Sequence, residues 1–84
     1  MNDNEKELIS SDELVKLANH ALKSHDDYID GLVVYKAVQT PDAIVFKGEN
    51  FLDEQGLPTA KSMAAFNLYK WLSYQFSAFY TVES

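Results

Sequence analysis

The densest group of side chains able to do chemistry lies between residues 53 and 62 of this 84-residue sequence. It holds two carboxylates, two hydroxyls and one ammonium group: Asp53, Glu54, Thr59, Ser62 and Lys61. Thr59 is the expected N-cap of a long helix, whose first backbone N–H groups and positive dipole end attract anions. With Lys61 and the two hydroxyls, these N–H groups would suit a phosphate or carboxylate ligand.

The same residues also have a purely structural interpretation. The helix dipole disfavours a cation in the first turn, so Lys61 is expected to pair with Asp53 or Glu54. A solvent-facing pair of this kind contributes only about 0–1 kcal/mol. The spacing from Gly56 to Lys61 does not match a phosphate-binding P-loop, and the two carboxylates oppose a bound anion. An anion site predicts a pocket around Lys61, whereas the structural role predicts an ion pair and no cavity.

Other patterns for metal binding or catalysis are weak. His20 and His25 stand about 140° apart on a helix, so they do not share one metal from a single face. His25 with Asp26 and Asp27 would form only a loose surface site, and a helix-end role for His25 is favoured. The sequence has no Cys, which excludes disulfides, thiolate zinc sites and cysteine nucleophiles. We expect no catalytic residue, no metal and no cofactor.

The composition argues against nucleic acids and membranes as partners. Seven Lys and no Arg face 13 Asp and Glu, which gives a formal net charge of −6, whereas phosphate backbones are bound by clustered cations. No run approaches the roughly 18–20 apolar residues that span a bilayer. The start of the chain lacks the basic and apolar regions of a signal peptide, so we expect a cytoplasmic protein.

The charge is unevenly distributed along the chain. Residues 1–42 hold nine acidic residues and four Lys, whereas residues 43–84 hold four acidic residues and three Lys. An acidic N-terminal half keeps a protein soluble by self-repulsion, and it would also suit a basic protein partner.

The elements that must position these residues form one small α+β domain. We expect a flexible acidic N-terminus at residues 1–9 and a single domain at 10–84, in the order α-β-β-α. Ser10 followed by Glu13 is a capping-box pattern, which predicts a first helix over 11–25.

An antiparallel hairpin is expected next. Segments 32–38 and 43–46 are rich in β-branched and aromatic residues, and Thr40-Pro41-Asp42 between them predicts a turn. Alternation places Ile44 and Phe46 on one face and Val45 and Lys47 on the other. Beyond the hairpin, Phe51 either pairs briefly as a third strand or fills the core.

A long helix is expected over residues 60–80, which contain no Gly or Pro and seven of the 11 aromatic residues. It should pack across one face of the hairpin, with the first helix beside it. Its predicted core stripe consists of Ala65, Leu68, Tyr69, Leu72, Phe76 and Phe79. A hairpin and one short helix cover only one side, so apolar surface should remain for a protein partner or a second copy. The predicted interface residues are Met63, Trp71, Tyr74 and Tyr80.

The segment Gly48–Ser62, read as GENFLDEQGLPTAKS, resembles the signature of the YciN-like family of small enterobacterial proteins. Ala65-Phe66-Asn67 and Lys70 also fit, and Ala18-Asn19 and Val45-Phe46 agree more loosely. The resemblance implies a small intracellular bacterial protein of unknown function and supplies no catalytic residues. The leading hypothesis is therefore a non-catalytic protein-interaction or regulatory module, with a homodimer as one form of it. The alternative is a small-ligand or anion-binding module, conceivably catalytic, centred on residues 53–62.

Overall fold

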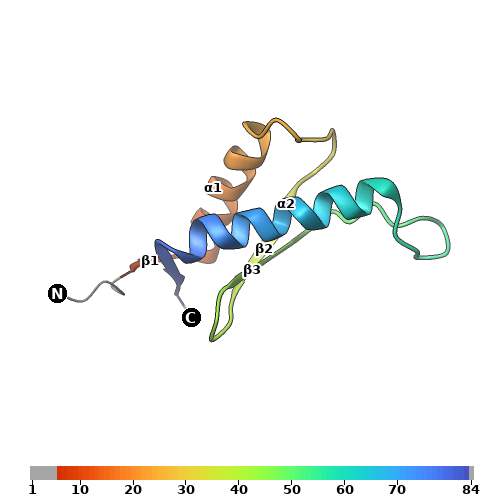
Figure 1. Cartoon of the computed structure of the whole chain (residues 1–84). Coiled ribbons are helices and arrows are strands. Elements are labelled where there is room, and N and C mark those ends of the chain that lie inside the picture. The colour runs from red at the N-terminus through yellow and green to blue at the C-terminus, as the bar shows by residue number, and fades with distance from the viewer. Residues whose placement is uncertain (1–5, 84) are drawn as a thin grey trace.

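The computed structural model describes residues 6–83, which form two helices and four strands (Figure 1). The elements are β1 (Glu7–Ile9), α1 (Ser11–Lys23), β2 (Val34–Gln39), β3 (Ile44–Gly48), α2 (Ala60–Ser77) and β4 (Tyr80–Val82). Strands β2 and β3 form an antiparallel hairpin, whereas β1 and β4 form a short parallel ribbon. The predicted α+β fold, with its order of helix, hairpin and helix, is confirmed.

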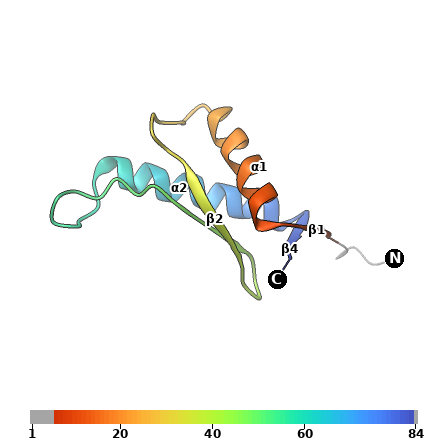
Figure 2. The same ribbon diagram turned by 180° about the vertical axis from the view of Figure 1, so that it is seen from behind.

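Each helix packs mainly against one strand of the hairpin. Helix α1 lies along β2 and helix α2 along β3. Seen from behind, β2 crosses in front of α2, with α1 beside it (Figure 2). The β2 side of the hairpin therefore lies toward α1, and the β3 side lies toward α2.

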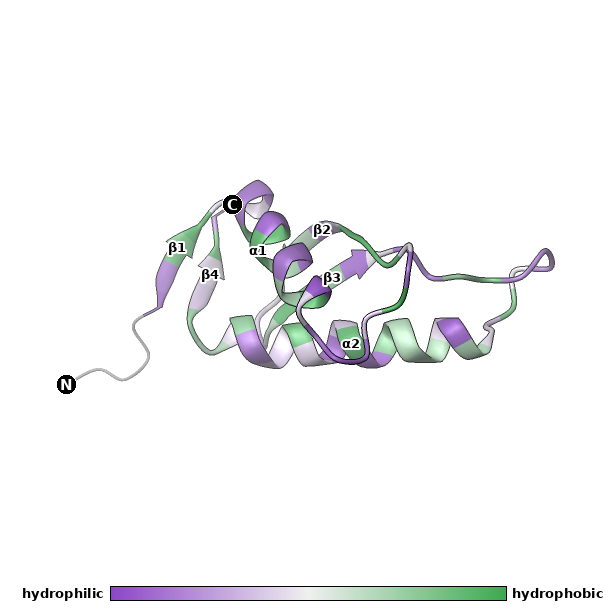
Figure 3. Ribbon diagram, turned by 90° about the horizontal axis from the view of Figure 1, so that it is seen from above, coloured by the Kyte–Doolittle hydropathy of each residue, from purple (hydrophilic) through white to green (hydrophobic). Residues whose placement is uncertain are grey.

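One hydrophobic core joins both helices to the inner face of the hairpin. Ile44 and Phe46 are buried in it, while Val45 and Lys47 are exposed, as the alternation predicts. Hydrophobic and hydrophilic residues alternate along the strands and around the helices (Figure 3). The other buried apolar residues are Ile9, Leu14, Ala18, Leu22, Leu32, Val34, Ala37, Ala65, Leu68, Tyr69, Leu72 and Val82.

Both helices start at the predicted caps. The Ser10 hydroxyl accepts a hydrogen bond from the Glu13 N–H at 3.1 Å. The Thr59 hydroxyl accepts one from the Ser62 N–H at 3.2 Å, and the Ser62 hydroxyl accepts one from the Thr59 N–H at 2.9 Å. These bonds satisfy N–H groups that have no partner within the helix.

The β1–β4 ribbon corrects two predictions about the chain ends. Of the segment 1–9 that was expected to be flexible, residues 7–9 form β1, and residues 1–5 lie outside the described part. The long helix ends at Ser77 rather than at residue 80, and Tyr80 begins β4. The Glu7 N–H donates to Phe79 O at 3.0 Å and the Glu83 N–H donates to Ile9 O at 2.8 Å. The residues of β4, Tyr80–Val82, are aromatic or β-branched, and such residues favour extended strands.

The early end of α2 also changes the predicted core stripe. Phe79 lies beyond the last turn of the helix and is 66% exposed instead of buried. The other predicted members of the stripe are buried in the core or packed against it.

Phe51 does not form a third strand. Its φ angle of 54° lies in the left-handed region, which is incompatible with an extended strand. Its ring is partly buried against the core, so the second prediction, that Phe51 fills a gap there, describes its position.

Candidate functional site

Of the two carboxylates in the 53–62 segment, one accepts hydrogen bonds within its own loop and the other is exposed to solvent. Asp53 Oδ1 accepts hydrogen bonds from the N–H groups of Gln55 at 2.9 Å and Leu57 at 2.8 Å. Gly56 supplies the positive φ of 82° that this turn needs. Glu54 is exposed at the tip of the loop. Asp53 therefore closes the turn that leads into α2.

The hydroxyls of Thr59 and Ser62 are engaged with backbone. Both donate to the carbonyl oxygen of Phe51, at 2.8 and 3.0 Å, while each also accepts its capping bond. Lys61 Nζ lies over the Phe51 ring, 5.4 Å from its centroid, in a cation–π arrangement. Lys61 therefore contacts the Phe51 ring instead of pairing with Asp53 or Glu54. The two hydroxyl bonds hold Phe51, in its left-handed conformation, against the start of α2.

Ser62 is the buried centre of this cap, since its side chain is fully inaccessible. Ser62→Ala should lower the free energy of unfolding by about 1–2 kcal/mol, because the Thr59 N–H loses its acceptor inside the protein. Urea unfolding would measure the change. The matched control is Ser73→Ala, at a partly exposed position of the same helix beside the groove, which should change stability by less than about 0.5 kcal/mol. Equal effects of the two variants would contradict this role.

The predicted interface residues are not gathered in one place. Met63 and Tyr74 are 57% and 84% exposed, as their helical positions predict. Trp71 is half-buried, with its ring 4.6 Å from that of His25 in an edge-on contact. Tyr80 lies in β4, with its ring centroid 6.0 Å from that of Phe76.

The histidines and the described carboxylates form no metal centre. His25 Nδ1 accepts a hydrogen bond from the Asp27 N–H at 2.9 Å, which is a helix-end role. Within residues 6–83, no three His, Asp or Glu side chains are placed to hold a metal ion. None of the described helices is both long and apolar enough to cross a membrane.

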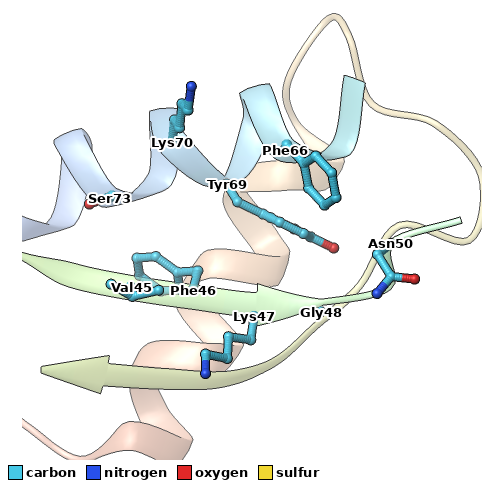
Figure 4. A pocket seen from close by; sticks show the side chains of 9 residues that line it. All are labelled: Val45, Phe46, Lys47, Gly48, Asn50, Phe66, Tyr69, Lys70 and Ser73. Atoms are coloured by element: carbon cyan, nitrogen blue, oxygen red, sulfur yellow. The ribbon is translucent and has the colours of Figure 1, made fainter. Parts of the chain in front are cut away.

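An open, mainly apolar groove of about 490 Å³ lies between β3 and α2 (Figure 4). The rings of Phe66 and Tyr69 project from α2 toward the end of β3, while Lys70 points away from the strand at the rim. Its volume falls in the range of small-ligand and peptide-side-chain sites. The residues that line the groove are Val45, Phe46, Lys47, Gly48, Asn50, Phe66, Tyr69, Lys70 and Ser73.

The β2 edge of the hairpin, on the side away from this groove, is bonded by side chains. Asn19 on α1 donates to Val34 O at 3.0 Å and accepts from the Val34 N–H at 2.7 Å. Ser11 donates to Ala37 O at 3.1 Å. The Asn19 amide thus takes the place of a neighbouring strand, and α1 closes this edge against further pairing.

Tyr69 lines the groove, and its hydroxyl has a structural role. Its hydroxyl donates to Glu49 O at 2.6 Å and lies 3.3 Å from Val33 O. Burial raises the pKa of Tyr69 from 10.0 to about 12, with smaller contributions from Glu49 and Tyr35. A phenol with a raised pKa stays protonated at neutral pH, which suits a hydrogen-bond donor and not a base.

The raised pKa of Tyr69 predicts a loss of stability at high pH. The contribution of its neutral hydroxyl is fully present below pH 10.0 and is lost as the pH rises from 10.0 to about 12. Tyr69→Phe should therefore be less stable than the wild type at pH 8, and this difference should shrink between pH 10 and 12. Because both proteins share the other Tyr and the Lys residues, the contributions of these residues to the pH dependence cancel when the two free energies of unfolding are compared. A difference that is independent of pH would contradict the prediction.

The groove was missed at the sequence level, although two signals for it exist. The residues Phe66, Tyr69, Lys70 and Ser73 follow helical spacing along one stripe, and Val45 and Lys47 alternate with buried residues on β3. Neither signal says that the two elements lie beside each other.

Comparison with known proteins gives relatives along nearly the whole chain. A family model described as "Protein of unknown function (DUF2498)" matches residues 5–83. Protein YciN of Escherichia coli strain K12 is 42% identical over 76 residues, which cover 90% of this chain and 92% of that protein. The YciN proteins of the O6:H1 and O157:H7 strains of E. coli give the same figures. The names of these relatives state no activity, substrate or partner.

Proposed function

Because the chain belongs to the DUF2498 family of proteins of unknown function, a YciN-like family as residues 48–62 predict, we propose its function from the site itself. The protein acts as a non-catalytic interaction module, and the groove between β3 and α2 receives a protein partner. The observation that carries this proposal is a mainly apolar groove beside the outer edge of β3, with which no described strand pairs.

The side chains around the groove favour binding over catalysis. Tyr69 is committed to two carbonyl oxygens and remains protonated at neutral pH. Exposed Val45 and Tyr74 lie at or near the groove, where apolar and aromatic side chains commonly anchor partners. Tyr74 is one of the interface residues expected from the sequence, and it lines the adjoining hollow along α2.

The other predicted surfaces have less support. The hydroxyls of Thr59 and Ser62, proposed for an anion site, already bond the Phe51 carbonyl. The acidic N-terminal half borders two hollows beside His25 and Trp71, but most of the residues that line them there are polar or charged, unlike those of the groove beside β3. We therefore place the partner at β3 and α2.

Site-specific photo-crosslinking in cells that make the protein tests this proposal. A photoreactive phenylalanine derivative replaces Val45 in the groove, and in a matched control it replaces Leu17 on α1. The two positions have nearly equal exposure, 39% and 41%. The proposal predicts a discrete protein adduct from position 45 that position 17 does not give. Failure to form an adduct at position 45, or the same adducts at both positions, would contradict it.

A further inference from the structure

The outer edge of β3 carries backbone groups that the fold leaves open. Residues of an antiparallel pair alternate between those that bond the partner strand and those that face outward. The Ile44 N–H faces outward, because it donates to Ser77 Oγ on α2 at 2.8 Å. By the same alternation, the N–H and C=O groups of Phe46 and Gly48 face the groove, and no described side chain bonds them.

The contrast with the β2 edge makes this opening informative. On β2, side chains of α1 bond the outward N–H and C=O groups of Val34 and the C=O group of Ala37. At β3, Ser77 of α2 bonds only the outward N–H of Ile44. Tyr69 bonds Glu49 O, which lies just beyond the strand at a residue whose N–H faces Val33 O on the β2 side. Phe46 and Gly48 both line the groove, and Phe46 is only 5% exposed, so little water reaches its backbone groups. Unpaired backbone groups in such a place gain free energy from a partner.

The charge beside this edge is positive on an otherwise acidic chain. Lys47 lies directly opposite Lys36 across the hairpin, and both are exposed on the face that the helices leave uncovered. Like charges directly opposite each other destabilise a strand pair. Lys70 adds a third ammonium group at the rim of the groove. An acidic partner would relieve this repulsion.

The geometry points to an extended acidic segment of a partner protein that adds to β3 as a third strand. Its backbone pairs with Phe46 and Gly48. Alternate apolar side chains enter the groove beside Phe66, and the intervening carboxylates lie on the face of the sheet that carries Lys47. Strand addition of this kind takes affinity from main-chain hydrogen bonds and specificity from alternate side chains. The inference rests on the proposed function, because it names the partner of the same groove.

A second copy of this chain fits the edge less well. Pairing β3 with β3 of another copy would bring Lys47 and Lys70 of both copies to one interface. That arrangement doubles the positive charge at the interface, whereas an acidic segment neutralises it.

The probe is the synthetic peptide acetyl-Glu-Val-Glu-Val-Glu-Val-Glu-amide, with its affinity for the full chain measured by isothermal titration calorimetry. We expect it to bind more tightly than the peptide in which Lys replaces every Glu. Lys47→Glu should weaken binding of the acidic peptide about fivefold to tenfold at low salt, and less at high salt. The matched control Lys16→Glu makes the same charge change at an exposed position on α1 and should leave the affinity unchanged within about twofold.

Two N-methylated forms of the acidic peptide test the main-chain bonds. In antiparallel addition the Val residues present their N–H groups to β3, and in parallel addition the Glu residues do so. Strand addition therefore predicts that one form loses binding while the other keeps it.

Three results would overturn the inference: equal binding of both methylated forms, preference for the Lys peptide, or a dimer joined through β3. If the crosslink from position 45 survives while the acidic peptide does not bind, the proposed function stands and only this inference fails.

Discussion

Gly48→Ala should lower the free energy of unfolding by about 2–3 kcal/mol, because β3 has no room for a side chain at this position. A Cβ atom built on Gly48 overlaps the carbonyl oxygen of Val33 and lies 2.7 Å from Tyr69 Oη. Val33 O is backbone and Tyr69 is held by Glu49 O, so neither moves away cheaply. In a domain of this size the change corresponds to a fall in melting temperature of roughly 10–20 °C.

The matched control for Gly48→Ala is Gly56→Ala in the turn before α2. Gly56 has a φ of 82° but nothing within 4 Å of a built Cβ, so its substitution is strained without a clash. We expect a loss of about 1 kcal/mol there. Thermal unfolding followed by circular dichroism compares the two. If Gly48→Ala were as mild as Gly56→Ala, the close approach of β3 to Val33 and Tyr69 would be wrong.

Asn19→Ala should lower the free energy of unfolding by about 2–4 kcal/mol, because both backbone groups of Val34 lose their partner. Val34 is 1% exposed, so water does not replace the Asn19 amide freely. The loss should also open the β2 edge, which α1 otherwise closes. Chemical unfolding would measure the first effect, and faster amide exchange at Val34 would report the second.

Two further variants separate the hydrogen bonds of Asn19 from its size. Asn19→Asp keeps the shape and the acceptor for the Val34 N–H, but it replaces the donor to Val34 O with an oxygen, so it too should destabilise. Asn67→Ala removes an exposed amide from α2 and should change stability by less than about 0.5 kcal/mol. If Asn19→Asp were neutral, the donor to Val34 O would be unimportant.

Local features of the sequence predicted the helices and the hairpin well. The caps at Ser10 and Thr59 act over three residues, and the faces of β3 follow from simple alternation, so neither depends on the rest of the fold. The exposed positions of Met63 and Tyr74 follow from helical spacing in the same way.

The features that the sequence did not predict depend on distant contacts. No Gly or Pro ends α2, which stops because residues 80–82 pair with residues 7–9 from the other end of the chain. Phe51 takes a left-handed conformation because Thr59 and Ser62 hold its carbonyl, a bond that strand propensity does not anticipate.

The candidate site was the least predictable part, because it is made by juxtaposition. The 53–62 segment was predicted as a site because of its polar and charged side chains, yet those of Asp53, Thr59 and Ser62 form hydrogen bonds with backbone groups. The groove depends instead on the hairpin register, which turns the backbone N–H and C=O groups of Phe46 and Gly48 outward, and on the path of α2 beside them. A single sequence carries neither.

The central claim, that a partner strand pairs with the open edge of β3, is tested most directly by amide hydrogen exchange at Phe46 and Gly48. Exchange is followed by NMR in the free protein and with saturating acetyl-Glu-Val-Glu-Val-Glu-Val-Glu-amide. The amide of Val45 faces β2 in the hairpin ladder and serves as the internal reference. We expect the peptide to slow exchange at Phe46 and Gly48 at least about tenfold relative to Val45. Unchanged exchange at both positions, or protection confined to α1 or to residues 53–62, would contradict the claim.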